Sequence, residues 1–168
     1  MAGRSVRAAA LLTLLTPVCH GEAAAGVNVY QAEPYVIAAD VYGVEPYLGR
    51  AGWTWYTGSA GWMFRVALES ILGMSLREGK LLVLCPCIPP EWPGFSLDYR
   101  RPGTGACYRI VVRRTGSATS ARAEGLVVRV EQGAVLVELG SDGQDHRIEI
   151  ELGPDAGPRY RPAESASP

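Results

Sequence analysis

The sequence predicts an α+β fold, with a helical part in residues 1–75 and a β-rich part in residues 76–153. Two patterns carry this prediction. Apolar residues recur at helical spacing before residue 75, whereas short runs that alternate apolar and polar residues follow it. We expect these runs to form a small antiparallel β-sandwich. Residues 154–168 are rich in proline and serine, which predicts a disordered tail.

The first element is expected to be a helix. Ala8, Leu11, Leu12 and Leu15 recur at positions i, i+3, i+4 and i+7, and Pro17 would end the helix. The same segment has arginines before its apolar run and small residues after it, which is also the outline of a secretory signal peptide. The apolar run is too short to span a bilayer, so no membrane segment is predicted.

Two further helices are expected. Residues 33–43 have a proline near their start and a glycine at their end, which is typical of a short helix. After a long aromatic loop, a second helix covers residues 60–73 and ends at Gly73. The apolar stripe of this helix consists of Ala60, Met63, Phe64, Ala67 and Ile71.

The β-rich part contains short apolar runs separated by glycine, proline or aspartate. Residues 108–112 and 147–151 alternate most clearly between apolar and polar side chains. The sequences EQGA (131–134) and SDGQ (141–144) are typical of hairpin turns. Each turn is therefore expected to connect two strands that pair with each other.

Composition argues against two classes of function. A net charge of −1 and an isoelectric point near 6.1 argue against a general nucleic-acid-binding protein, which would have a strong basic excess. Cys85 and Cys87 are too close together for the usual spacing of zinc ligands, so no metal site is predicted. We interpret these two cysteines, together with Cys19 and Cys107, as small buried thiols.

The sequence TGSAG (57–61), at the start of the helix expected over residues 60–73, is suited to binding an anion. A helix amino terminus carries unpaired N–H groups and a partial positive charge. Thr57 and Ser59 supply hydroxyl groups, and Gly58 would let a ligand approach the backbone. Plain N-capping by Thr57 or Ser59 is the alternative interpretation.

Aromatic residues surround this turn. Trp53, Trp55 and Tyr56 precede it, and their flat faces are of the kind that stack on sugar rings. They are therefore candidate substrate-binding residues. Core packing is the alternative interpretation, and it applies best to Trp62, which lies within the expected helix.

No catalytic residue can be selected from the pattern. Glu33, Asp40 and Glu45 are the acidic candidates in the helical part for the protonated carboxyl group that glycoside cleavage needs. Their spacing favours none of them over a role as surface carboxylates. No nucleophile and base pair is evident.

Two long motifs resemble one enzyme family. The segment YQAEPYVIAADVYGVEPYLGRAGWTWYTGSAGWMFRVALESILGM and the later PCIPPEWPGFSLDYR are similar to the carboxy-terminal part of the inverting glycoside phosphorylases. These are the cellobiose phosphorylase-like enzymes of glycoside hydrolase family 94, formerly glycosyltransferase family 36. The motifs are most similar to its cyclic β-1,2-glucan synthase branch. The resemblance implies the last helices of an (α/α)6 barrel followed by a small β-sandwich.

The resemblance also implies a mechanism. An aspartic acid donates a proton, inorganic phosphate attacks the sugar carbon with inversion, and a sugar 1-phosphate is formed. The family's phosphate contacts fall on Thr57 and Gly58, whereas its catalytic aspartate and its phosphate-binding arginine and histidine lie upstream of the matching segment. Ala39 stands where cellobiose phosphorylases have a sugar-contacting glutamine, which favours the glucan synthase branch over cellobiose.

Two functions from different classes follow. In the first, the chain is the carboxy-terminal part of a cytoplasmic phosphorylase or glycosyltransferase that acts on β-glucan oligosaccharides. It would use phosphate as co-substrate without another cofactor, require the upstream part of the same barrel as partner, and be inactive alone. In the second, it is a secreted, non-catalytic glucan-binding β-module whose first 25 or so residues are removed as a signal peptide. Intact mass distinguishes the two. A remnant without activity is the third alternative, and a neighbouring reading frame that supplies the rest of the barrel would favour the first function over it.

Overall fold

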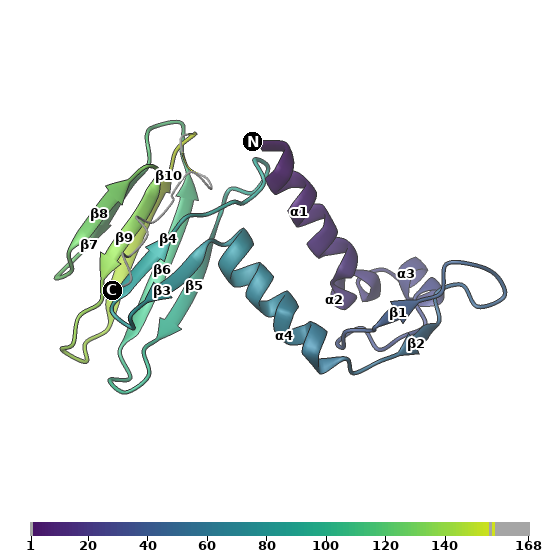
Figure 1. Ribbon diagram of the computed structural model, residues 1–168. Helices are drawn as coiled ribbons and strands as arrows, with labels where there is room; N and C mark the ends of the chain where they lie inside the picture. The colour runs from purple at the N-terminus through teal and green to yellow at the C-terminus, as the bar shows by residue number, and fades with distance from the viewer. Residues whose placement is uncertain (1, 155, 157–168) are drawn as a thin grey trace, which may run out of the picture. The chain divides into compact units, whose positions relative to one another are not determined.

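The computed structural model describes residues 2–154 and 156, and of residues 2–5 it describes the backbone alone (Figure 1). The chain divides into two compact units, one built from Gly3–Ala67 and the other beginning at Leu68. Helices occur in the first unit and strands dominate the second, so the expected α+β class is confirmed. The expected disordered tail, residues 154–168, lies almost wholly outside the described residues.

The first unit opens with three helices: α1 (Ala2–Leu15), α2 (Pro17–Gly21) and α3 (Ala24–Val29). Pro17 occupies the first turn of α2, where its missing N–H group costs nothing, and α1 ends two residues before it. The predicted helix over residues 8–15 is therefore confirmed. Ala9 of α1 is buried, which favours a helix that belongs to the folded unit.

The helix predicted for residues 33–43 does not form. This segment contains turns and the short strand β1 (Asp40–Val41), which pairs antiparallel with β2 (Ala51–Trp53). Backbone groups are satisfied across the pair instead of along a helix, since the Ala39 N–H donates to the Trp53 carbonyl at 2.8 Å. β-Branched side chains at positions 36 and 37 also favour this extended conformation.

The helix predicted for residues 60–73 is confirmed, but it starts three residues earlier, at Thr57. α4 (Thr57–Arg65) continues directly into the π-helix η1 (Val66–Ile71), and Gly73 follows with a φ of +72°. The predicted apolar stripe is buried only in part. Ile71 is buried and Met63 is half-buried, whereas Ala60 and Phe64 are exposed.

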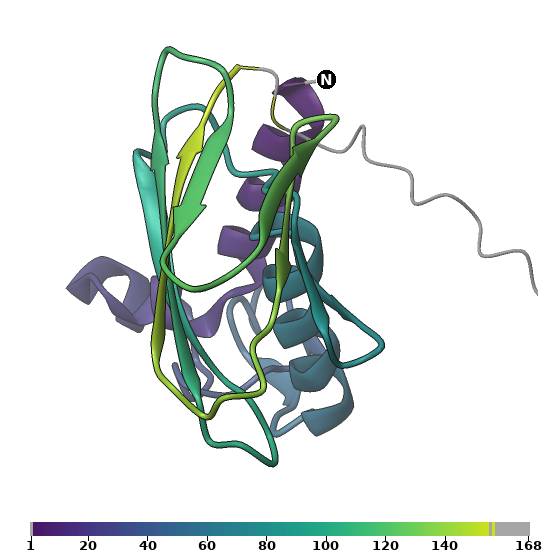
Figure 2. The same ribbon diagram turned by 90° about the vertical axis from the view of Figure 1, so that its left-hand side faces the viewer.

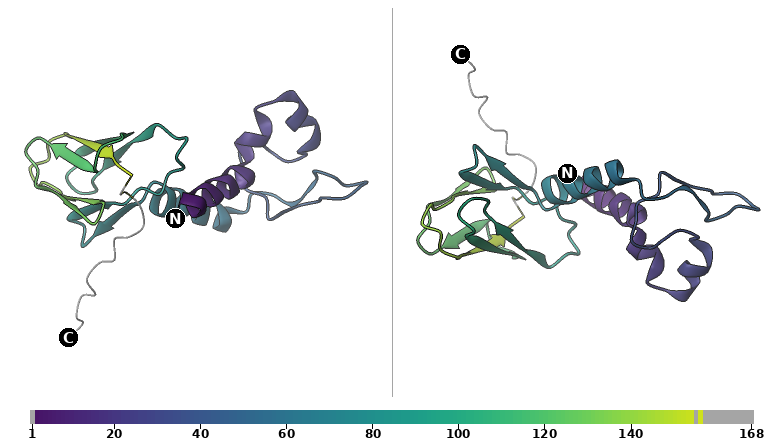
Figure 3. Two further views of the ribbon diagram at one scale, coloured as in Figure 1. Left: turned by 90° about the horizontal axis from the view of Figure 1, so that it is seen from above. Right: turned by 90° about the horizontal axis from the view of Figure 1, so that it is seen from below.

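The second unit consists of two four-stranded sheets, which appear as separate layers in Figures 2 and 3. One sheet has the strand order β5-β6-β10-β7 and the other has the order β3-β4-β9-β8. The strands are β3 (Met74–Arg77), β4 (Leu81–Leu84), β5 (Gly94–Arg100), β6 (Cys107–Arg114), β7 (Ser120–Ala123), β8 (Val128–Glu131), β9 (Ala134–Glu138) and β10 (His146–Leu152).

The core of the second unit follows from the alternating pattern. Tyr108 and Ile110 of β6 are buried, as are Ile148 and Ile150 of the neighbouring β10, while the residues between them are more exposed. Ile110 pairs in register with Ile148. Because successive side chains of a strand point to opposite faces, one face of this sheet supplies a continuous apolar layer.

Two details of the predicted β-topology are wrong. The turn EQGA does form a hairpin, with Gln132 and Gly133 at φ values of +51° and +78° between β8 and β9. The turn SDGQ does not, because it leads from β9 in one sheet to β10 in the other. The sandwich is also not purely antiparallel, since β10 pairs parallel to β6. Parallel pairing requires a long connection, and β7, β8 and β9 supply it.

Apolar side chains are distributed very unequally between the units. Of the buried apolar side chains in the described residues, all but Ala9, Pro17 and Val36 lie in the second unit. Of the large apolar side chains that are exposed in the same residues, all but Leu76, Val127 and Val130 lie in the first. The second unit thus has a core of its own, whereas the first leaves much apolar surface open.

We predict that Glu149→Gln lowers the stability of the second unit at neutral pH and that the loss disappears in acid. The Arg122 and Arg147 guanidinium groups, with N–O distances of 2.7 and 2.9 Å, hold the pKa of the Glu149 carboxyl below its usual range. A group whose pKa is lower in the folded than in the unfolded state stabilises the folded state at pH values above the unfolded-state pKa. This contribution is lost as the pH falls through the folded-state pKa. Urea denaturation of the wild type and of Glu149→Gln, at pH 7 and at pH 3, measures the loss of stability at each pH. An equal difference at the two pH values would contradict the prediction.

Candidate functional site

The opening turn of α4 presents unpaired backbone amides. The Thr57 N–H donates to the Trp55 carbonyl at 2.9 Å, and the Ala60 N–H donates to the Tyr56 carbonyl at 3.1 Å. The amides of Gly58 and Ser59 therefore have no intrahelical acceptor. The N-cap position is occupied by Tyr56, whose side chain makes no capping hydrogen bond, so plain capping by Thr57 or Ser59 is not what the structure contains. This end of the helix can receive an anion.

Gly58 is not required by the packing of the chain. A Cβ added to Gly58 would meet no atom within 4 Å, and the same holds for Gly61 one turn later. Neither glycine has a positive φ, so other residues could adopt its backbone conformation. Gly58 leaves the amides of the opening turn accessible from outside the unit, which is the property that close approach of a ligand needs.

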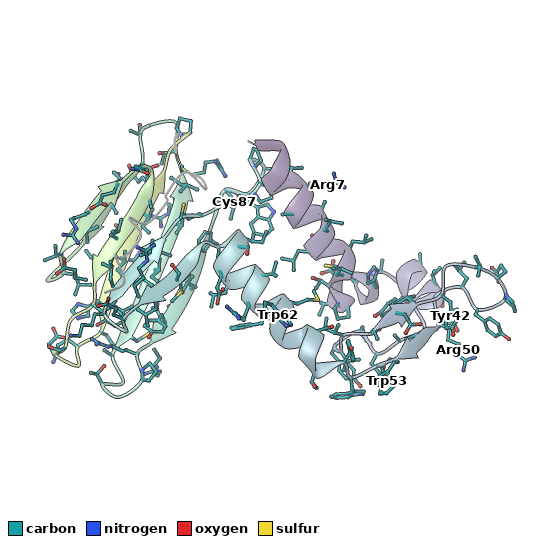
Figure 4. All side chains as sticks on the ribbon, viewed as in Figure 1. Arg7, Tyr42, Arg50, Trp53, Trp62 and Cys87 are labelled. Atoms are coloured by element: carbon teal, nitrogen blue, oxygen red, sulfur yellow. The ribbon has the colours of Figure 1, made fainter. Side chains whose placement is uncertain are left out.

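The candidate substrate-binding aromatic residues lie on the surface. Trp53 is 69% exposed, Trp55 61% and Tyr56 46%, so core packing does not account for them within this unit. Core packing, the alternative interpretation that applied best to Trp62, does not account for it within this unit either, since it is 66% exposed, with the Arg65 guanidinium 5.1 Å from its ring centre. Figure 4 shows Trp53 beyond β2 and Trp62 beside α4.

The three acidic candidates lie in different surroundings. Glu33 is half-buried, and its Oε1 accepts hydrogen bonds from Trp55 Nε1 at 3.3 Å and from Thr54 Oγ1 at 3.5 Å. Asp40 lies against Gly52, where an added Cβ would be 2.8 Å from Asp40 Oδ1. Glu45 is exposed in the loop between β1 and β2. The structure therefore does not bring these carboxylates together at one site.

An apolar groove of about 460 Å³ runs between α1 and α4, which lie alongside each other within the first unit (Figure 1). Its lining comes from three segments of the unit: Ala8, Leu11, Leu12 and Leu15 of α1; Ile37, Ala38 and Ala39; and Ser59, Trp62, Met63 and Val66. Ala39 is thus part of the groove wall, near the beginning of α4.

Other site chemistry is limited. Within the described part of the chain, no group of three or more His, Cys, Asp or Glu residues is placed to hold a metal ion. Cys19 is exposed and Cys85, Cys87 and Cys107 are half-buried, so the interpretation of all four as buried thiols is wrong. None of the described helices is long and apolar enough to cross a membrane.

Comparison with known proteins bears on the same segment. Residues 1–73, which contain α1, α4 and the aromatic loop, match the family model described as the Glycosyl hydrolase 94 superfamily, catalytic domain. The resemblance to glycoside hydrolase family 94 is confirmed. The glycoside hydrolase 94 match ends at Gly73, two residues after the helical run ends at Ile71.

Relatives that are named as a glucan synthase and as phosphorylases are similar to this chain. It is 50% identical over 101 residues to the cyclic beta-(1,2)-glucan synthase NdvB of Rhizobium meliloti (strain 1021). The matched residues cover 60% of the chain and 4% of that relative. It is 39% identical over 82 residues to the N,N'-diacetylchitobiose phosphorylase of Vibrio proteolyticus, 48% of the chain and 10% of that protein. It is 26% identical over 121 residues to the solabiose phosphorylase of Paenibacillus borealis, and the matched region covers 71% of the chain and 15% of that protein. The chain therefore spans a small part of each of these three relatives.

Sequence reasoning missed how Trp55 is held. The contact between Glu33 and the Trp55 indole joins residues 22 positions apart, and no periodic pattern connects them. Tyr35, on the same segment as Glu33, meets the Trp55 ring edge-on, with ring centres 6.1 Å apart. The acidic residue was visible in the sequence only as one of several candidates for proton transfer.

Proposed function

We propose that this chain is the carboxy-terminal part of a glycoside hydrolase 94 phosphorylase or glycosyltransferase that acts on β-glucan oligosaccharides in the cytoplasm. One observation carries the proposal. The opening turn of α4 offers the Gly58 and Ser59 amides to an anion, and exposed aromatic faces lie immediately before it in the chain. This arrangement falls within the segment that matches the family's catalytic domain.

In the proposed reaction, a phosphate oxygen attacks the anomeric carbon as the glycosidic bond breaks, with inversion at that carbon. The leaving oxygen takes a proton from an aspartic acid of the upstream part of the enzyme. The part of this chain is to hold and orient the reactants. Thr57 and the opening amides bind the phosphate, and the side chains of Trp53, Trp55 and Tyr56 stack on the sugar. Fixing the two reactants against each other lowers the entropic part of the barrier.

The proposed partner is the remainder of the same catalytic domain, as helices that cover the apolar face of the first unit. Three observations support this partner. The first unit exposes most of its large apolar side chains, the family match describes a catalytic domain, and the chain spans at most 15% of the relatives reported above. Helices of an (α/α)6 barrel bury apolar faces against their neighbours, which is the surface that is open here.

We predict that Gly58→Ala weakens phosphate binding about tenfold, because the added methyl group obstructs the opening amides and a hydrogen bond to a charged group is worth about 1.5–3 kcal/mol. Thr57→Ala is expected to weaken it similarly, and Thr57→Ser to preserve it. Phosphate titration followed by ³¹P NMR measures the affinity.

Gly61→Ala is the matched control for Gly58→Ala. Both positions lie in α4 and both have open space around the missing Cβ, so both changes remove a helix glycine without a clash. Gly61 lies beyond the opening turn, so Gly61→Ala should leave phosphate affinity unchanged. Equal weakening by the two variants, or none by either, would count against the proposed phosphate site.

A further inference from the structure

We propose that Glu33 is a positioning residue that orients the indole of Trp55 as a rigid sugar-stacking surface. This inference rests on the proposed function and adds a residue that determines how the sugar is held. Its basis is the set of contacts that surround Trp55 in the first unit. All of them join residues between positions 33 and 57.

The indole is held at its polar edge. Trp55 Nε1–H donates to Glu33 Oε1 at 3.3 Å, and Thr54 Oγ1–H reaches the same oxygen at 3.5 Å. Glu33 is half-buried, so its carboxyl group has fewer conformations than a fully exposed one. Both contacts use Glu33 Oε1 as an acceptor, and they hold the carboxyl group against the indole edge and the Thr54 hydroxyl. The geometry thus favours positioning over proton transfer for this residue.

The backbone at Trp55 is held in a conformation that a large side chain avoids. Its φ is +58°, in the left-handed region. The neighbouring hydrogen bonds fix this conformation: the Tyr56 N–H donates to the Ile37 carbonyl at 2.9 Å, and the Thr57 N–H donates to the Trp55 carbonyl at 2.9 Å. A strained conformation persists only where its surroundings determine it, and such positions concentrate at functional sites.

The ring itself remains available. Tyr35 meets it edge-on at an angle of 72°, and yet 61% of Trp55 is exposed. A tryptophan that is fixed in backbone and ring orientation, but open to solvent, loses little conformational entropy when a ligand stacks on it. Trp53 is similarly exposed, but no hydrogen bond of its indole is seen in the described residues. Of these two exposed tryptophans, Trp55 is therefore the one whose ring orientation is fixed.

NMR spectroscopy of the full chain labelled with ¹⁵N tests the positioning. The four tryptophans give four indole N–H signals, and Trp55→Phe assigns one of them by deleting it. We expect Glu33→Ala to shift that signal upfield, because the hydrogen bond is lost, and Glu33→Gln to retain most of the original shift. The other three signals report whether the fold is intact. An unchanged Trp55 signal in Glu33→Ala overturns the positioning role.

Titration with a β-1,2-linked glucan oligosaccharide tests what the positioning does. Glu33→Ala should weaken affinity about threefold to tenfold in the wild-type background, while in the Trp55→Ala background it should have no further effect. Glu33→Gln should stay within about twofold of the wild type. A loss that persists without Trp55 overturns the inference, because Glu33 would then act on another part of the unit. Absence of binding by the wild-type chain contradicts the sugar-stacking surface that the proposed function assigns to Trp53, Trp55 and Tyr56, and the indole signal distinguishes that result from a failure of the positioning role.

Discussion

Purified protein comprising residues 1–168 is expected to release no sugar 1-phosphate above background from β-1,2-glucan and phosphate. The resemblance places the proton-donating aspartate upstream of the matching segment, and general acid catalysis contributes about 10²–10⁴-fold to such reactions. The three acidic candidates of the first unit are not placed to replace it. Glu33 accepts from Trp55, Asp40 lies against Gly52, and Glu45 is exposed in a loop.

An enzyme-coupled assay for sugar 1-phosphate measures this prediction, and a family phosphorylase with its own substrate serves as the positive control. The variant Thr57→Ala separates real turnover from contamination. Activity above background that Thr57→Ala abolishes would refute the prediction of an inactive chain. Activity that Thr57→Ala leaves unchanged would come from another protein in the preparation.

Gly73→Ala is expected to destabilise the second unit by about 4 kcal/mol or more, a size that usually has an identifiable steric cause. Gly73 has a φ of +72°, and an added Cβ would overlap the Cys85 carbonyl and lie 2.7 Å from Pro86 N. The segment cannot move away freely, because the Cys85 N–H donates to the Gly73 carbonyl at 2.8 Å. Since whole domains have about 5–15 kcal/mol of stability, much of the fold should be lost.

Gly79→Ala provides the control for backbone conformation alone. Gly79 has a similar φ of +65°, in the turn between β3 and β4, but an added Cβ there would meet no atom within 4 Å. Its expected cost is about 1–2 kcal/mol, from the left-handed conformation. Urea denaturation of both variants measures the difference. Equal losses would show that the overlap at Gly73 is relieved by a small shift.

Local patterns predicted much of the second unit. The alternation in residues 108–112 and 147–151 places every second side chain on one face of a sheet, and the structure buries that face. Such a pattern does not specify which strands become neighbours, because each strand has two edges and can pair at either one. The parallel pairing of β6 with β10, and the path of SDGQ from one sheet to the other, depended on which strands met.

The same limit applies to the first unit. The segment 33–43 has local features of a helix, but most of its backbone hydrogen bonds join it to residues 49–56, and long-range pairing overrides weak helix propensity. Trp62 lies within a helical pattern, which favoured core packing as an alternative interpretation, yet it is exposed in the described unit. Whether a tryptophan is buried depends on what packs over it, which its own sequence neighbours do not specify.

The α+β class, the helix that opens near Thr57, the β-rich second part and the resemblance to glycoside hydrolase family 94 could all be predicted from the amino-acid sequence. Each of these depends on neighbouring residues or on a long contiguous motif. Three properties came from the three-dimensional structure instead: the open space above Gly58, the exposure of Trp53 and Trp55, and the hydrogen bond from the Trp55 indole to Glu33. These properties depend on distances between residues that are separated along the chain, and folding alone establishes those distances.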